Sequence, residues 1–189
     1  LSHSSAASDV YKRQLLEHHK DVGGRYSIFT NVGIVPAIIS GLNIDALFGG
    51  ASEVINNIDN YKPYDLGRYL TQKENVKFTN NVLMTYSDSL YFFGKWYLQL
   101  WAESIGKNNK GITAIHSVGT TDQHSQLQLY LDGPKDKYFT FITTDHSNKG
   151  IKINNDMFEG TAIDYLKDKT MGDLMEAEQR LSLIHISEP

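Results

Sequence analysis

The feature that most constrains the fold is an alternation of short apolar runs with longer segments of helical character in the middle of the chain. The runs at 81–88, 112–118 and 137–143 are short, apolar and bounded by polar residues, which is typical of strands. Segments 89–104 and 122–131, which lie between them, predict helices. Because strands that alternate with helices form parallel sheets, the pattern predicts an α/β protein, a three-layer αβα sandwich with a mainly parallel sheet.

Polar residues and a glycine predict the ends of the helix over 89–104. Ser87, Asp88 and Ser89 are all available as its N-cap. Gly106 is placed to end the helix in the left-handed conformation.

The N-terminal part predicts a turn, a buried segment and two helical stretches. The glycine pair that starts at Gly23 indicates a tight turn, and the apolar run 32–39 after it indicates a buried segment. Segments 43–48 and 51–58 have helical spacing.

Charge and composition exclude several classes of protein. The 18 basic residues against 22 acidic ones give a net charge of −4, which offers no basis for binding nucleic acid or an anionic membrane. The absence of cysteine excludes disulfides, thiolate zinc sites and cysteine nucleophiles, and it fits a reducing compartment. No apolar run approaches the roughly 20 residues of a membrane-spanning helix. We therefore expect a cytoplasmic protein without nucleic-acid or membrane partners.

The two ends of the chain differ in character from the rest. Residues 1–14 are rich in serine and alanine and lack the apolar core of a signal peptide. We expect 1–14 and 181–189 to be a non-native leader and tail, since both resemble translated vector sequence. Just before that tail, 169–180 predicts a surface helix with Leu174 and Ala177 on one face.

The first group of candidate site residues is Gly24 and Arg25, in the stretch GGRYS. Glycine lets backbone N–H groups and the guanidinium converge, which suits an anion. Turns of this composition also occur with a purely structural role, so both interpretations remain open.

The second group is Gln99 and Glu103, which are four residues apart and share one face of the predicted helix near its end. A carboxylate at a helix C-terminus is electrostatically unfavourable. Glu103 therefore either has a function or is a solvated side chain beside Lys107.

The third group is Asp122 and His124, in the stretch GTTDQH that follows the strand over 112–118. Ligands of open α/β sheets bind at the carboxyl ends of the strands. Asp122 has an alternative role as a helix cap, and His124 has one as an ordinary first-turn histidine. The histidines lack metal-ligand spacing, so we expect no metal site.

Together these stretches resemble the glucose-6-phosphate isomerase family. The matching stretches are GGRYS at 23–27, QLWAESIGK at 99–107 and GTTDQHSQLQLYLDGP at 119–134. TMGDLMEAE at 170–178 is also similar to a later region of the family, and the resemblance extends over nearly all of 22–180.

The resemblance implies a pair of sugar-isomerase (SIS) domains, each a parallel sheet between helices. Residues 15–60 then correspond to the end of the first domain and the connection, and 61–180 to an incomplete second domain. It also implies an enzyme that interconverts glucose 6-phosphate and fructose 6-phosphate as a homodimer, without a cofactor.

The resemblance further implies a role for each candidate residue. Glu103, in the motif ESxGK, corresponds to the base, and Arg25 corresponds to the arginine that stabilises the enediolate. His124 corresponds to the histidine that opens the sugar ring, which in the family is contributed across the dimer interface. Gln99 and Gly24 correspond to residues that hold the substrate and its phosphate.

The chemistry of aldose-ketose isomerisation agrees with these roles. A proton moves between adjacent carbons through an enediolate, so the reaction needs a carboxylate base and a fixed positive charge near the developing oxyanion. Ring opening needs proton transfer at the ring oxygen, which a near-neutral imidazole performs well.

Two elements of the family have no counterpart here. Nothing in 1–20 matches its phosphate loop, and no lysine after Arg180 matches the one that assists ring opening. We therefore expect an internal fragment that is inactive alone. The alternative is a non-catalytic SIS-type module that binds sugar phosphates, but Arg25, Glu103 and His124 together favour the enzyme because a binder needs no base.

Overall fold

The computed structural model describes residues 16–72, 77–154 and 158–187. The predicted leader 1–14 lies outside them. The chain forms two compact units, the first of which ends at Tyr69. The division into SIS domains after residue 60, which the resemblance implies, stays a prediction. Helix α5 (Pro63–Thr71) crosses the structural boundary, and its start at a proline is favourable because the φ of proline is already helical.

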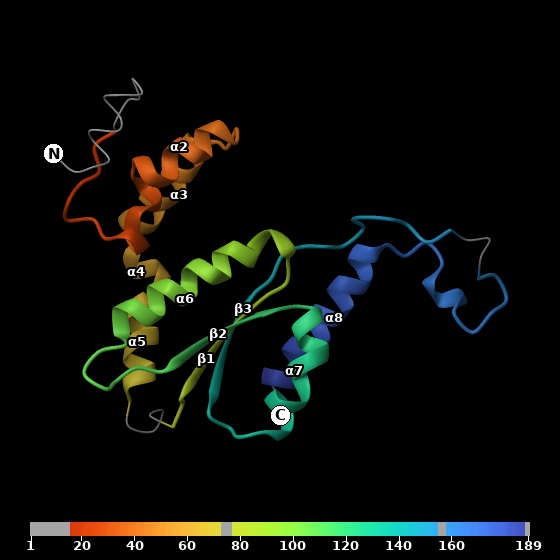
Figure 1. The fold of residues 1–189 in the computed structure, drawn as a ribbon. Coiled ribbons are helices and arrows are strands. Elements are labelled where there is room, and N and C mark those ends of the chain that lie inside the picture. The colour runs from red at the N-terminus through yellow and green to blue at the C-terminus, as the bar shows by residue number, and fades with distance from the viewer. Residues whose placement is uncertain (1–15, 73–76, 155–157, 188–189) are drawn as a thin grey trace, which may run out of the picture. The chain divides into compact units, whose positions relative to one another are not determined.

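The first unit is helical over its described residues (Figure 1). Most of the two segments predicted at 43–48 and 51–58 forms one continuous helix, α3 (Ile44–Asn56), and Ile58 starts the next helix. Asn43 caps α3, because its side chain accepts a hydrogen bond from the Ala46 amide at 2.9 Å. The elements before α5 are the 3₁₀ helix η1 (Gly24–Phe29), α2 (Asn31–Ile39), α3 (Ile44–Asn56) and α4 (Ile58–Tyr61).

The apolar run 32–39 forms helix α2, and its predicted burial is wrong. Thr30 caps this helix by accepting a hydrogen bond from the Val32 amide at 3.3 Å. Within the described chain no residue of α2 is buried, and Ile39 is 80% exposed. The reason is that η1 and α3, which pack against α2, leave most of its surface accessible.

In the described part of the second unit, three strands form a parallel sheet in the order β2-β1-β3. Leu83 of the central strand lies opposite His116 on one side and Thr140 on the other. All of the predicted strands are present, and their parallel pairing is confirmed. They are β1 (Asn80–Thr85), β2 (Thr113–Val118) and β3 (Lys137–Ile142).

Helices cover both faces of this sheet (Figure 1). Helix α6 (Tyr91–Ile105) lies on one face, and α7 (Thr121–Asp132) and α8 (Met171–Ser187) lie on the other. This arrangement confirms the predicted α/β fold with three layers.

The two faces of β1 differ in chemistry because successive side chains of a strand point to opposite sides. On the α6 face, the Asn81 amide donates a hydrogen bond to the Tyr97 hydroxyl, and the Thr85 hydroxyl lies 3.0 Å from Nε2 of His116. The opposite face carries the apolar core, whose buried members are Val82, Met84, Tyr86 and Tyr130.

The start of α6 differs from the sequence prediction. The residue before the helix is Leu90, and it makes no side-chain cap. The Ser87 and Ser89 hydroxyls lie 2.7 Å apart and form a hydrogen bond with each other. The predicted cap is therefore wrong, because a 3₁₀ turn over Asp88–Leu90 precedes the helix.

The end of α6 also differs. Gly106 has φ −74° and ψ 71°, so the predicted left-handed conformation is wrong. The Lys107 amide donates to the Ile105 carbonyl at 2.9 Å, which makes Gly106 the centre of an inverse γ-turn. Such a turn redirects the chain without a positive φ.

Helix α8 starts with a reciprocal pair of hydrogen bonds. The Asp173 carboxylate accepts from the Thr170 amide at 2.7 Å, and the Thr170 hydroxyl accepts from the Asp173 amide at 3.2 Å. This arrangement satisfies two amides at the start of the helix, as a capping box does.

Leu174 and Ala177 share one exposed face of α8, as predicted, and both line the same pocket. Other residues of the helix contact the core, since Met175 and Ile186 pack against it while Leu174 is 50% exposed. The helix continues past residue 180, so its later turns also take part in packing. The non-native origin of 181–189 stays a prediction.

We expect Gly94→Ala to destabilise the second unit. A Cβ atom at Gly94 would lie 2.2 Å from Nε2 of His116, where α6 crosses β2. Overpacking of this kind costs about 1–3 kcal/mol. Gly49→Ala in α3 is the control, since a Cβ there meets no atom within 4 Å. Urea unfolding of both variants measures the difference, and equal midpoints would contradict the close packing.

Candidate active site

Helix α6 presents Gln99 and Glu103 on one exposed face near its C-terminal end. The Gln99 amide donates a hydrogen bond to a Glu103 carboxylate oxygen at 3.1 Å. The prediction that these side chains share a face is confirmed. The result is an accessible carboxylate oriented by an amide, and such a group can accept a proton from a bound molecule.

Glu103 lies at the edge of the sheet where the strands begin. The Trp101 indole N–H donates to the Ile112 carbonyl at 2.9 Å, and Ile112 immediately precedes β2. The last turn of α6 is therefore held beside the start of β2.

The first turn of α7, which directly follows the connection from β2, carries His124 at the opposite edge. The Asp122 carboxylate accepts a hydrogen bond from the Val118 amide at 2.7 Å, so it ties the helix back to the strand. Asp122 does not cap α7, whose N-cap is Thr120 and lacks a side-chain bond. The His124 amide donates to the Thr120 carbonyl at 3.1 Å, and the residue is exposed.

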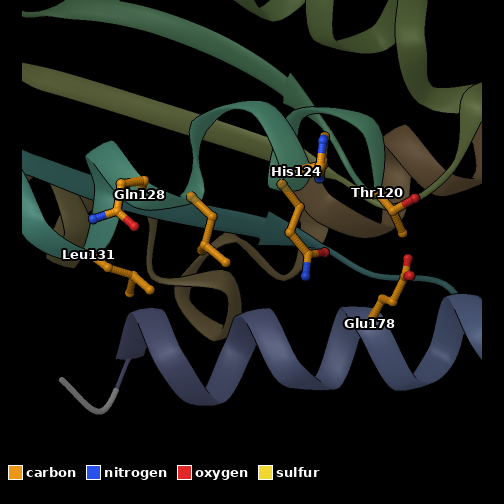
Figure 2. Close-up of a pocket in the computed structure, with 7 residues that line it drawn as sticks. Thr120, His124, Gln128, Leu131 and Glu178 are labelled. Carbon is orange, nitrogen blue, oxygen red and sulfur yellow. The ribbon is translucent and has the colours of Figure 1, made fainter.

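A pocket of about 440 Å³ lies between α7 and α8. Figure 2 shows Glu178 directed from α8 toward Thr120, and the His124 ring turned away from α8. The imidazole is thus accessible from outside the second unit. The lining residues are Thr120, Gln123, His124, Leu127, Gln128, Leu131 and Glu178.

Glu103 and His124 do not come together within one chain. One precedes β2 and the other follows it, and β2 contains 6 residues. At the rise of a strand this places the two side chains roughly 20 Å apart. Two groups at this distance cannot act on the same sugar within one copy of this unit.

Arg25 and Gly24 belong to the first unit. The turn predicted there is present, since the Tyr26 amide donates to the Gly23 carbonyl at 2.9 Å. The Arg25 guanidinium lies 4.6 Å from the centre of the Tyr26 ring, which gives a cation–π contact. Gly23 has φ −66°, a backbone conformation that any residue can adopt. A Cβ at Gly24 would meet no atom within 4 Å.

Two residues of the second unit, His116 and Tyr86, are absent from the candidates that the sequence suggests. The His116 ring lies on the α6 face of the sheet, in contact with the Tyr91 ring at 5.8 Å. Tyr86 is completely buried immediately after β1. In the sequence, only the alternation of strand residues indicated these two side chains, because it places each of them on a face of the sheet that helices cover.

Metal-binding clusters and membrane-spanning helices are both absent from the described residues. These residues contain no group of three or more histidine, aspartate and glutamate side chains that could hold a metal ion. They also contain no helix that is long and apolar enough to cross a membrane.

Comparison with known proteins identifies relatives of one kind. The chain is 36% identical over 163 residues to glucose-6-phosphate isomerase of Rubrobacter xylanophilus, a match that covers 84% of this chain and 38% of the relative. It is 45% identical over 130 residues to glucose-6-phosphate isomerase of Methanocaldococcus jannaschii, covering 65% of this chain and 32% of the relative. The chain is a homologue of glucose-6-phosphate isomerases. No family model matches it.

A solved structure agrees with the fold of this isomerase homologue. The crystal structure of a hypothetical protein from Thermus thermophilus matches it with a TM-score of 0.82 and 28% identity, covering 98% of this chain and 46% of the other. The chain therefore spans less than half the length of the relatives and of the solved structure that it matches.

We expect His116 to give the protein a pH-dependent stability. Burial lowers the pKa of His116, the charge of Lys95 lowers it further, and Asp122 acts in the opposite direction. The unfolded chain then binds this proton more readily, so stability is complete above about pH 6.5 and is lost as the pH falls toward the folded pKa. His116→Gln should therefore lose less stability than the parent between about pH 7 and pH 5 in urea titrations. Identical losses in both proteins would contradict this role.

Proposed function

We propose that this chain carries catalytic residues of an aldose-ketose isomerase that interconverts glucose 6-phosphate and fructose 6-phosphate through an enediolate. The similarity of the chain to isomerases at 36% and 45% identity supports the proposal. The observation that carries it is the exposed, hydrogen-bonded pair Gln99 and Glu103 at the end of α6. The reaction needs no cofactor, because the proton shift requires only a base and electrostatic stabilisation.

Glu103 is the base that moves the proton between the first two carbons of the sugar. Its carboxylate is exposed and accepts a hydrogen bond from the Gln99 amide, so a bound sugar can reach a carboxylate that is already oriented. Gln99 also helps to hold the phosphate of the substrate. Arg25 stabilises the negative charge of the enediolate, and Gly24, which has open space around it, allows the sugar phosphate to approach the backbone.

His124 opens the sugar ring before the proton shift. Because His124 and Glu103 of one chain lie roughly 20 Å apart, each site takes its histidine from a second copy. The protein that carries this chain is therefore a homodimer. A cytoplasmic location, without membrane or nucleic-acid partners, fits a net charge of −4.

A chimera allows these roles to be tested in a protein of the relatives' length. In it, the segment of this chain that aligns with the Rubrobacter xylanophilus relative, 84% of the chain, replaces its counterpart there. We first expect the chimera to be an active isomerase. A chimera that binds sugar phosphate without isomerising it would instead support the non-catalytic binding module.

Glu103→Gln should abolish the proton shift while leaving substrate binding intact. The amide keeps the shape of the side chain but has no basicity, so turnover should fall by about 10²- to 10⁴-fold, or roughly 3–5 kcal/mol of barrier. Calorimetry measures sugar-phosphate affinity, and NMR measures deuterium incorporation from solvent at C2. Near-normal exchange in this variant would eliminate Glu103 as the base.

Asp132→Asn is the matched control for this variant. Gln128 donates to the Asp132 carboxylate at 2.7 Å on α7, with the same spacing of four residues as Gln99 and Glu103. The control therefore removes an equivalent exposed carboxylate from an equivalent pair. It should leave turnover unchanged.

A hybrid dimer should show that each site draws on two chains. We expect the Glu103→Gln and His124→Ala chimeras to be inactive separately. A hybrid with one copy of each, isolated through two affinity tags, should regain about half of the parent activity because one of its two symmetric sites keeps both residues. If both residues of a site came from the same chain, the hybrid would remain inactive.

A further inference from the structure

We infer that Tyr86 is a positioning residue that holds the turn between β2 and α7 and thereby sets the place of His124. This inference rests on the proposed function for the role of His124 in ring opening. The fixing of the turn itself follows from contacts within the second unit, and it can be tested without any activity.

Tyr86 is anchored where the central strand ends. Its amide donates to the Ile142 carbonyl of β3 at 3.0 Å. Its carbonyl oxygen lies 3.2 Å from the Thr144 hydroxyl and 2.6 Å from Nε2 of His146, both of which follow β3. The backbone of Tyr86 therefore cannot shift without disturbing β3 and the segment after it.

The Tyr86 ring is one surface on which the turn rests. A Cβ atom at Gly119 would lie 2.3 Å from Cε1 of this ring, so the backbone at Gly119 packs directly on the aromatic side chain. The Gly119 amide also donates to the Thr85 carbonyl at 2.9 Å. The start of the turn thus lies against both the ring and the strand that carries it.

The Tyr86 hydroxyl holds the other end of the same turn. It donates to the side-chain oxygen of Gln123 at 3.0 Å, and both residues are buried. Burial raises the pKa of Tyr86, Ser182 acts in the opposite direction, and the nearby charge of Glu178 raises it further. The hydroxyl therefore keeps its proton and remains a donor.

These contacts leave the turn little freedom at the position of His124. One rigid side chain touches Gly119 through its ring and Gln123 through its hydroxyl, and His124 is the next residue. The hydrogen bond from the Val118 amide to the Asp122 carboxylate links the two ends of the turn. The backbone from which the exposed imidazole extends is therefore fixed, and proton transfer to a bound sugar requires such a defined position.

Tyr130 supplies a matched control on α7. It is also a buried tyrosine of the core, and its hydroxyl lies 2.7 Å from the Ser117 hydroxyl and 2.5 Å from the Gln126 side chain. Tyr130→Phe removes buried hydrogen bonds from the same layer as Tyr86→Phe does. It leaves the contacts of Gly119 and Gln123 in place.

The experiment compares Tyr86→Phe with Tyr130→Phe in the chimera by two measurements. The first is the NMR signal of the His124 ring Cε1–H group in protein with ¹³C-labelled histidine, assigned by its absence in His124→Ala. The second is turnover of cyclic glucose 6-phosphate against turnover of an open-chain analogue.

Tyr86→Phe should shift the His124 signal and slow turnover of the cyclic substrate by about 10- to 100-fold, with the open-chain analogue unaffected. Tyr130→Phe should change neither. An unshifted His124 signal in Tyr86→Phe, or an equal shift in both variants, would overturn the positioning role. A shifted signal together with equal losses of His124→Ala on both substrates would keep the positioning role and overturn the proposed function of His124.

Discussion

The second unit depends on the pairing of β1 with a parallel neighbour on each side. The strand bonds to β2 along one edge and to β3 along the other, and its side chains from Asn81 to Thr85 are buried on both faces. Because side chains cover it from both directions, β1 fixes where α6, α7 and α8 lie. The candidate residues of this unit stand on those helices or on the turns that join them to the sheet.

Parallel pairing also places the starts of all three strands at one end of the sheet and their ends at the other. Each strand runs in the same direction, so the end of α6 returns to one edge while α7 departs from the other. Glu103 and His124 follow these helices to opposite edges, and this is the physical basis for proposing that a site combines two copies. Closing a site between copies also allows it to exclude water, which strengthens electrostatic interactions with the substrate.

Hydrogen bonds inside the second unit fix the position of α7 on the sheet more closely than apolar packing alone does. Ser117 pairs with Tyr130, and Tyr86 pairs with Gln123, each across the space between the sheet and α7. A slip of this helix would leave these buried groups without partners, which costs more than the bonds contribute when made. Such pairs favour one register of helix on sheet, and the turn that carries His124 benefits directly from it.

The amino-acid sequence by itself determined the strands, the helices between them, the parallel sheet, and the shared face of Gln99 and Glu103, because these follow from local periodicity. It also contained stretches, such as ESIGK, that resemble the glucose-6-phosphate isomerase family. Only the tertiary structure decided how α6 begins and ends, that α2 stays exposed, and that Tyr86 supports the turn before His124. These outcomes depend on which surfaces and polar groups meet across the fold, and contacts between residues distant in the chain leave no periodic trace in the sequence.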